Sequence, residues 1–242
     1  SALIALPVGL AAAIYLSEYA SDRVRSLLKP SLEVLAGVPT VIYGYMALVY
    51  VTPLVDSVLP LSVPLVPSGL PLFPEFTLVV PSLRTFNAMS ASIVVGIMII
   101  PMVSSISEDA LSAVPDSLRE AAYGLGSTKF DVSTKVVVPS ATSGIVASYV
   151  LAISRAIGET MAVTMAMGMS PQMPYFPNVL KNLAESSQTM TAAMVQIAGA
   201  DSYGGGPTYE AMFALGMTLF AITLTMNVLA ELVRRRFREA YE

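Results

Sequence analysis

Two charged side chains interrupt an otherwise apolar stretch of the sequence. Arg155 and Glu159 lie near the middle of residues 143–169, and in a helix a spacing of four residues would place both on one face. Each charge costs about 2.5–3.5 kcal/mol at the centre of a bilayer, so such residues normally face a partner helix or a watery path. A guanidinium presents a planar fork of donors that fits two oxygens of an oxyanion. The pair therefore indicates either an anion path or an internal ion pair that neutralises itself.

The composition favours a membrane protein with several spans. The 242 residues are 55% hydrophobic and only 12% charged, with a mean hydropathy of +0.69, whereas a soluble domain carries about 25% charged residues. The absence of Cys and His excludes thiol nucleophiles, disulfides and histidine-based triads. We expect no catalytic residue and no metal site. The net charge of −4 and the lack of a basic patch argue against a nucleic-acid partner.

Five apolar segments approach the length of about 20 residues that a helix needs to cross a bilayer. The sequence therefore predicts an all-α polytopic membrane protein, in which residues 1–242 form a single transmembrane domain. Because Ser1 opens directly into an apolar run, we expect a preceding helix to be missing. The predicted spans are residues 2–19, 35–55, 87–107, 143–169 and 210–233.

The basic residues are concentrated on one side of this topology. Ten of the 13 lie in the connector at 20–34, in the loop at 108–140 and in the C-terminal tail, and cytoplasmic connectors are rich in Lys and Arg. The asymmetry predicts that this loop and the C-terminus face the cytoplasm. The ten residues are Arg23, Arg25, Lys29, Arg119, Lys129, Lys135, Arg234, Arg235, Arg236 and Arg238.

The polar loop at 108–140 carries the signals of two short helices. Residues 117–120 and 128–131 each have the capping-box pattern, in which a hydroxyl and a carboxylate satisfy the first amides of a helix. The first helix would end at Gly124 or Gly126, because glycine accepts the positive φ of a helix C-cap. The pattern predicts a compact elbow of two helices. On these signals alone, an amphipathic helix pair lying on the membrane surface is the better interpretation.

A longer motif in this loop separates the two interpretations. Glu120-Ala121-Ala122-Tyr123-Gly124-Leu125-Gly126 is followed nine residues later by Val136-Val137-Val138-Pro139. This arrangement resembles the cytoplasmic coupling loop of ABC importer permeases, with Val136 and Val138 in place of the usual Ile and Leu.

The resemblance extends over most of the chain and is most specific for the phosphate importer permeases, the PstC and PstA subunits. It is carried by Ile-Ile-Pro at 99–101, by residues 155–164, and by the segments at 15–18 and 37–44. The Met-Ala-Val that follows Gly-Glu-Thr is more similar to PstC. The resemblance implies a MetI-like fold with six spans, of which five are visible here.

The resemblance also implies partners and a location. Such a permease sits in the inner (plasma) membrane of a prokaryotic cell and pairs with a second, PstA-like permease. Two copies of a nucleotide-binding ATPase subunit and an external phosphate-binding protein complete the importer. The sequence contains no G-x4-G-K-[ST] motif, so we expect ATP to bind the partner and this chain to need no cofactor.

Two groups of site residues follow. Coupling to the ATPase is expected at the motif, where Glu120 supplies charge, the two alanines permit close approach and Tyr123 adds apolar contact. The full coupling set is Glu120, Ala121, Ala122, Tyr123, Gly124, Gly126 and Pro139. The phosphate pathway is expected at Arg155, Glu159, Thr160 and Arg84.

Glu159 has a possible role in selectivity. Phosphate near neutral pH carries at least one proton that a carboxylate can accept in a hydrogen bond, and sulfate carries none. The pathway is therefore expected to favour phosphate over sulfate.

Three alternatives compete with this prediction. A permease for another oxyanion would share the coupling loop. A secondary anion transporter or channel often shows internal repeats, and we find none in the sequence. An intramembrane enzyme would lack His, Cys and a second buried carboxylate near Glu159.

Overall fold

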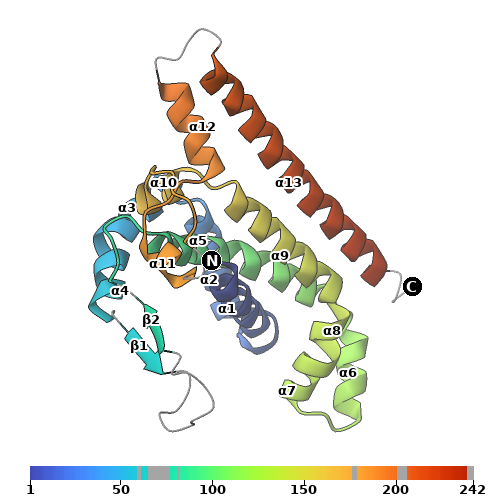
Figure 1. The fold of residues 1–242 in the computed structure, drawn as a ribbon. Helices are drawn as coiled ribbons and strands as arrows, with labels where there is room; N and C mark the ends of the chain where they lie inside the picture. The colour runs from blue at the N-terminus through green and yellow to red at the C-terminus, as the bar shows by residue number, and fades with distance from the viewer. Residues whose placement is uncertain (59–60, 65–76, 81, 176–178, 201–205, 239–242) are drawn as a thin grey trace, which may run out of the picture. The chain divides into compact units, whose positions relative to one another are not determined.

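The computed structural model describes residues 1–58, 61–64, 77–80, 82–175, 179–200 and 206–238 (Figure 1). As predicted, the described chain is predominantly α-helical. It adds one feature that was not predicted, an antiparallel hairpin of two short strands in which Leu61 lies opposite Val80. The strands are β1 (Leu61–Pro64) and β2 (Thr77–Val80).

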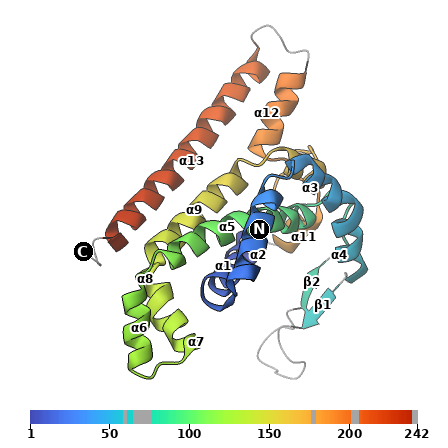
Figure 2. The same cartoon turned by 180° about the vertical axis from the view of Figure 1, so that it is seen from behind.

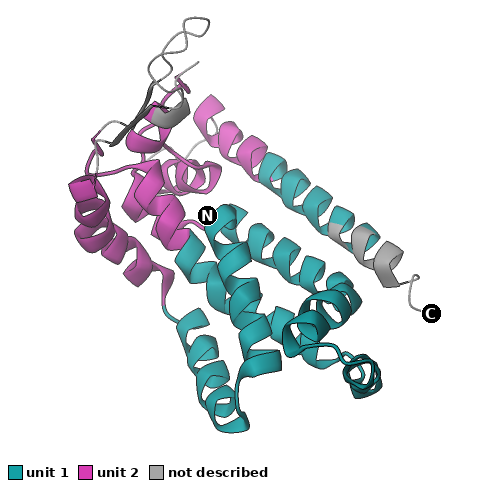
Figure 3. Cartoon of the chain, turned by 90° about the horizontal axis from the view of Figure 1, so that it is seen from below, with its two compact units in different colours: residues 1–38, 96–158, 217–242 teal, residues 39–95, 159–216 magenta. Residues whose placement is uncertain are grey.

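The chain divides into two compact units (Figure 3). Unit 1 contains residues 1–38, 96–158 and 217–242, and unit 2 contains residues 39–95 and 159–216. Each unit is therefore assembled from segments that are distant in the sequence.

Within the described ranges, four helical segments are long and apolar enough to cross a membrane, and they overlap four of the five predicted spans. The segments are Ala2–Tyr19, Thr40–Val58, Ala88–Ser112 and Pro207–Leu229. The first comprises α1 (Ala2–Ile14) and η1 (Tyr15–Tyr19), and the second comprises α3 (Thr40–Met46), η2 (Ala47–Val51) and α4 (Thr52–Val58). The last two belong to α5 (Ala88–Ser112) and α13 (Pro207–Arg238).

The fourth apolar segment is not the single helix predicted over residues 143–169. It begins with α9 (Thr142–Ile157), which ends at Gly158, and the chain forms a new helix only at α10 (Met161–Met167). Lys129–Ser140 and α9 together form a pair bent by 70°, which is long and apolar enough to make a fifth span. Apolar residues continue on both sides of the polar positions 158–160, so the sequence predicts the segment as one helix.

Small residues bring α5 and α9 together within unit 1. The hydroxyls of Ser107 and Ser148 lie 2.7 Å apart and both side chains are buried. Ala152, one turn further along α9, is also fully buried. Gly144, Ser148 and Ala152 thus form the closely packed stripe that their four-residue spacing predicts.

Unit 2 has its own apolar cluster around Ala47, Ala91, Val94 and Ala166. The start of α5 is fixed there by buried Asn87, whose side-chain oxygen accepts the amide of Ser90 at 2.7 Å. The remaining helices of this unit are α11 (Val179–Ala184) and α12 (Met190–Gly199).

Candidate functional site

The predicted elbow is present in unit 1 and follows the end of α5. In Figures 1 and 2 its two arms, α6 (Asp116–Gly124) and α7 (Lys129–Val132), lie side by side beyond the start of α9. The chain returns to α9 through η3 (Ser133–Val137) and α8 (Val138–Ser140).

A glycine turn joins the two arms. Gly126 has φ of 82°, and its amide donates to the Tyr123 carbonyl at 2.9 Å while the Ser127 amide donates to the Ala122 carbonyl at 3.1 Å. This pair of bonds is a Schellman motif, which satisfies the last carbonyls of a helix and favours glycine at the left-handed position. Of the two candidates, Gly126 is therefore the C-cap glycine, and Gly124 is the last residue of α6.

One of the two predicted caps is confirmed and the other is wrong. Thr128 caps α7, since its hydroxyl accepts the amide of Asp131 at 3.2 Å. Ser117 does not cap α6, because Pro115 already occupies the N-cap position and the helix begins at Asp116. Asp116 instead places a carboxylate in the first turn, where it complements the helix dipole.

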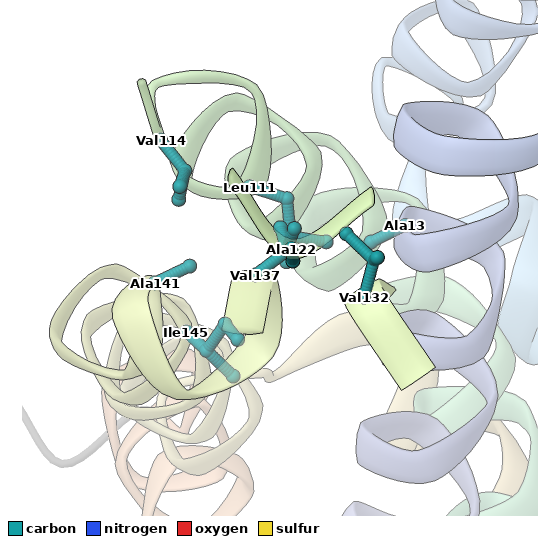
Figure 4. Packing of buried hydrophobic residues seen from close by; sticks show 8 residues of the cluster. All are labelled: Ala13, Leu111, Val114, Ala122, Val132, Val137, Ala141 and Ile145. Carbon is teal, nitrogen blue, oxygen red and sulfur yellow. The ribbon is translucent and has the colours of Figure 1, made fainter. Parts of the chain in front are cut away.

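The elbow has a buried face and an exposed face. Figure 4 shows Ala122, Val132 and Val137 within the buried cluster around Leu111 and Ile145. Ala122 thus packs against its own bundle, whereas Ala121 is exposed.

The opposite face presents a mixture of charge and apolar surface. Glu120 is exposed, as are Tyr123 (43%), Leu125 (89%) and Phe130 (67%). Pro139 also lies at the surface, in the first turn of α8, and its carbonyl accepts the hydroxyl of Thr142 at 2.8 Å. Large apolar side chains exposed beside a carboxylate on a fixed turn suit a docking surface.

A buried ion pair that was not predicted attaches α6 to the first span. Arg119 donates to the carboxylate of Glu18 at 3.0 Å, and their side chains are only 14% and 5% exposed. The two residues are 101 positions apart, so no local pattern indicates the pair.

A second unpredicted cluster attaches α2 (Asp22–Ala36) to the end of α5. Buried Glu108 pairs with Arg25 and with Lys29, whose Nζ lies 2.6 Å from Oε2, and Lys29 also pairs with Asp109. Hydrogen bonds to Asp109 and Glu108 raise the pKa of the Lys29 ammonium above its ordinary 10.5. Two of the basic residues used to assign the cytoplasmic side therefore also hold the chain together.

The residues predicted for the phosphate pathway do not share a helical face. Arg155 is exposed in the last turn of α9, and Glu159 lies beyond the end of that helix. The Glu159 side chain is buried and accepts the amide of Ala162 at 3.2 Å, so it satisfies an amide in the first turn of α10 from the position before the N-cap. Thr160 directly precedes α10. The break at Gly158 removes the periodicity on which the one-face prediction rested.

Arg84 lies in unit 2 before α5 and is paired. Its Nε lies 2.8 Å from the carboxylate of Glu185, and the two side chains are 65% and 15% exposed. Glu185 also borders a cavity of about 250 Å³, together with Tyr175, Asn182 and Ser186. The charge of Arg84 is thus largely balanced by its neighbour.

Comparisons with protein-family models and with known proteins agree on one family. Residues 5–239 match the model of the family described as binding-protein-dependent transport system inner membrane component. The chain is 35% identical to the phosphate transport system permease protein PstC of Haemophilus influenzae, with 98% of this chain and 71% of the relative covered. It is 30% identical to the probable ABC transporter permease protein YqgH of Bacillus subtilis, with 98% and 67% covered.

Two solved structures share the fold. An inward-facing MetNI methionine ABC transporter matches with a TM-score of 0.61 at 16% identity, covering 97% of this chain and 86% of that chain. An amino acid ABC transporter matches with a TM-score of 0.51 at 17% identity, covering 97% and 88%. These structures agree with the predicted MetI-like architecture.

Proposed function

Because the chain belongs to the family of binding-protein-dependent transport system inner membrane components and has PstC relatives over nearly its whole length, we propose that it is a membrane-spanning permease subunit of an ATP-driven phosphate importer. Members of this family are transport subunits and are not themselves enzymes. ATP is bound and hydrolysed by separate subunits in this proposal.

The elbow of α6 to α8 is the observation that carries the proposal. It is a short projection whose outer face carries exposed apolar and charged side chains and whose inner face is packed. Such a projection transmits force better than a flexible loop, because its turn is fixed by backbone hydrogen bonds. Glu120, Ala121 and Tyr123 contact the ATPase, and nucleotide-driven movement of that subunit displaces the elbow.

The proposal also covers the partners, the location and the orientation of the protein. The partners are a pair of ATPase subunits, a second permease of the PstA type and an external phosphate-binding protein. The protein lies in the inner (plasma) membrane of a prokaryotic cell with the elbow and the C-terminus in the cytoplasm, an orientation supported by the ten basic residues on that side.

Arg155 is the residue proposed to attract phosphate. Its side chain is exposed within an apolar part of the chain, and a guanidinium binds two phosphate oxygens at once. Glu159 and Thr160 follow at the helix break, where Glu159 restrains anion binding and favours the protonated anion. Arg84 contributes less, since Glu185 already neutralises it.

The experiment is reconstitution of the chain with its ATPase, second permease and binding protein in vesicles. ATP inside the vesicles should drive phosphate uptake that survives collapse of the proton gradient and stops when ATP is removed. Uptake that follows the proton gradient would favour a secondary transporter instead. If sulfate, molybdate or another anion is taken up in preference to phosphate, the assignment as a permease stands and the assignment of phosphate as its substrate is wrong.

A second experiment tests the elbow. Glu120→Ala should leave membrane insertion and assembly intact while phosphate uptake falls relative to ATP turnover. Lys135→Ala is the matched control, because Lys135 is an exposed charge of the same elbow that pairs only locally with Asp131. Normal coupling in the Glu120 variant would show that this carboxylate is not part of the ATPase contact.

A further inference from the structure

The guanidinium of Arg119 connects three separate elements of unit 1. From α6 it donates to the Glu18 carboxylate of η1 at 3.0 Å, to the Leu111 carbonyl of α5 at 2.8 Å, and to the Val114 carbonyl between α5 and α6. These three partners lie on the inner side of the elbow, and a fourth, the exposed carboxylate of Asp116 in the first turn of α6, lies 3.2 Å away. The Arg119 side chain is only 14% exposed.

Each of these contacts has a physical reason. The Leu111 carbonyl lies in the last turn of α5, where carbonyls have no partner within the helix and the helix dipole favours a cation. The Val114 carbonyl lies just beyond that turn. Glu18 balances the guanidinium charge, which would be costly to bury alone. The rigid, planar fork of arginine serves these acceptors at fixed angles, which a lysine ammonium on a flexible stem does not.

The two faces of α6 therefore have different contacts. Glu120 and Tyr123 are exposed on the outside, whereas Arg119 and Ala122 face inward. The contacts of Ala122 are apolar and non-directional, so they permit α6 to slide or rotate over the cluster. The hydrogen bonds of Arg119 are directional and oppose that movement.

We propose that Arg119 is a positioning residue that makes α6 move together with η1 and α5, and that Glu18 is the partner that balances its charge. The inference rests on the proposed function, because it assigns the route by which force from the ATPase leaves the elbow. Without Arg119, the elbow would follow the ATPase while the spans lagged behind.

The test measures phosphate taken up per ATP hydrolysed in reconstituted vesicles. Arg119→Gln should lower this ratio about tenfold, the change expected on losing one charge-assisted hydrogen bond, while ATP turnover persists. Glu18→Ala should give a smaller decrease, because Arg119 keeps its two carbonyl partners. Arg23→Gln is the matched control, since Arg23 is an exposed arginine of the neighbouring helix α2 and should retain the wild-type ratio.

A crosslink gives an independent readout. The sequence contains no Cys, so Glu18→Cys with Arg119→Cys introduces a unique thiol pair. The double variant should be poorly coupled, and a short bismaleimide that joins the two thiols should restore uptake per ATP. A role in folding alone would not be rescued by a crosslink added after assembly.

The outcomes separate the inference from the proposed function. A wild-type complex that hydrolyses ATP without moving phosphate contradicts the proposed function. A coupled wild-type complex together with an equally coupled Arg119→Gln variant overturns the inference alone. Parallel loss of uptake, turnover and assembled complex also overturns it, because the role would then be structural. Should Arg119→Gln fail to assemble, an unchanged ratio in Glu18→Ala overturns it.

Discussion

Gly144 on α9 lies so close to Ala110 on α5 that a β-carbon at Gly144 would overlap the β-carbon of Ala110. One turn away, Ser107 and Ser148 share a hydrogen bond of 2.7 Å between buried hydroxyls. The two helices are therefore held at a separation that only small residues permit, and lipid-embedded helices depend on such packing because no hydrophobic force from water drives them together.

Gly144→Ala is expected to destabilise the protein by about 1–3 kcal/mol, the usual range for overpacking a tight contact. The thermal midpoint of the purified complex measures this loss. Gly199→Ala is the control, since nothing lies within 4 Å of the added methyl group there. Adding Ala110→Gly to Gly144→Ala should restore stability by making room. A double variant as unstable as the single one would place the strain elsewhere.

The two glycines of the elbow are expected to respond in opposite ways to alanine. Gly126→Ala forces a side chain into the left-handed region, which costs about 1–2 kcal/mol. Gly124→Ala lies in the last turn of α6 with nothing within 4 Å, and should stabilise by about 0.4–1 kcal/mol through the unfolded state. The temperature of thermal unfolding and the amount of phosphate taken up per ATP hydrolysed distinguish the two variants. Equal losses in both would contradict the Schellman turn.

Glu108→Gln is expected to cost about 3 kcal/mol, because it leaves Arg25 and Lys29 without their buried counter-charge. Asp109→Asn is the matched control. Its side chain is 62% exposed, so its loss should cost less than about 1 kcal/mol. Comparable destabilisation by both variants would mean that Glu108 is not the centre of the cluster.

The same cluster gives an expected pH dependence. Because the folded-state pKa of Lys29 is raised above 10.5, its contribution to stability is fully present below the unfolded-state value and is lost as pH rises through the folded-state value. Wild-type protein should therefore lose the Lys29 contribution to stability only in strongly alkaline solution. The Lys29→Met variant should not show this alkaline loss of stability. Loss of the Lys29 contribution near neutral pH would contradict the ion pairs.

The Glu159→Gln variant separates two roles of this side chain, its hydrogen bond to the start of α10 and its negative charge. The amide oxygen of glutamine can still accept from Ala162, so the start of α10 should remain folded while the carboxylate charge is lost. If Glu159 acts on the substrate, discrimination between phosphate and sulfate should weaken in uptake competition. Arg84→Gln, at an arginine that Glu185 neutralises, should leave that discrimination unchanged. Wild-type selectivity in the Glu159 variant would leave it the hydrogen-bonding role alone.

Local signals in the sequence predicted the elbow well. The turn at Gly126 and the cap at Thr128 are determined by residues within four positions, so their chemistry is visible in the sequence. Ser117 failed as a cap because Pro115 competes for the same position. The break after Ile157 was missed because the apolar residues on its two sides resemble one span, although Gly158 and Glu159 interrupt them.

Contacts between distant residues were not predictable in the same way. Arg119 with Glu18 and Arg25 with Glu108 join positions 101 and 83 residues apart. Taken alone, Arg25, Glu108 and Arg119 resembled ordinary members of the cytoplasmic connectors, and Glu18 fell at the end of the first predicted span. Only the packing of the first span and α2 against α5 shows which charges are partners.

The interruption between α9 and α10 also limits where the chain can reside. Residues 158–160 leave the regular helix in the middle of an apolar segment, and irregular backbone at membrane depth is tolerated only against protein or beside water. The chain itself supplies part of that cover, because Glu159 is buried and its carbonyl accepts the hydroxyl of Thr191 on α12 at 3.3 Å. Loss of this hydroxyl would therefore expose an irregular stretch of backbone to lipid.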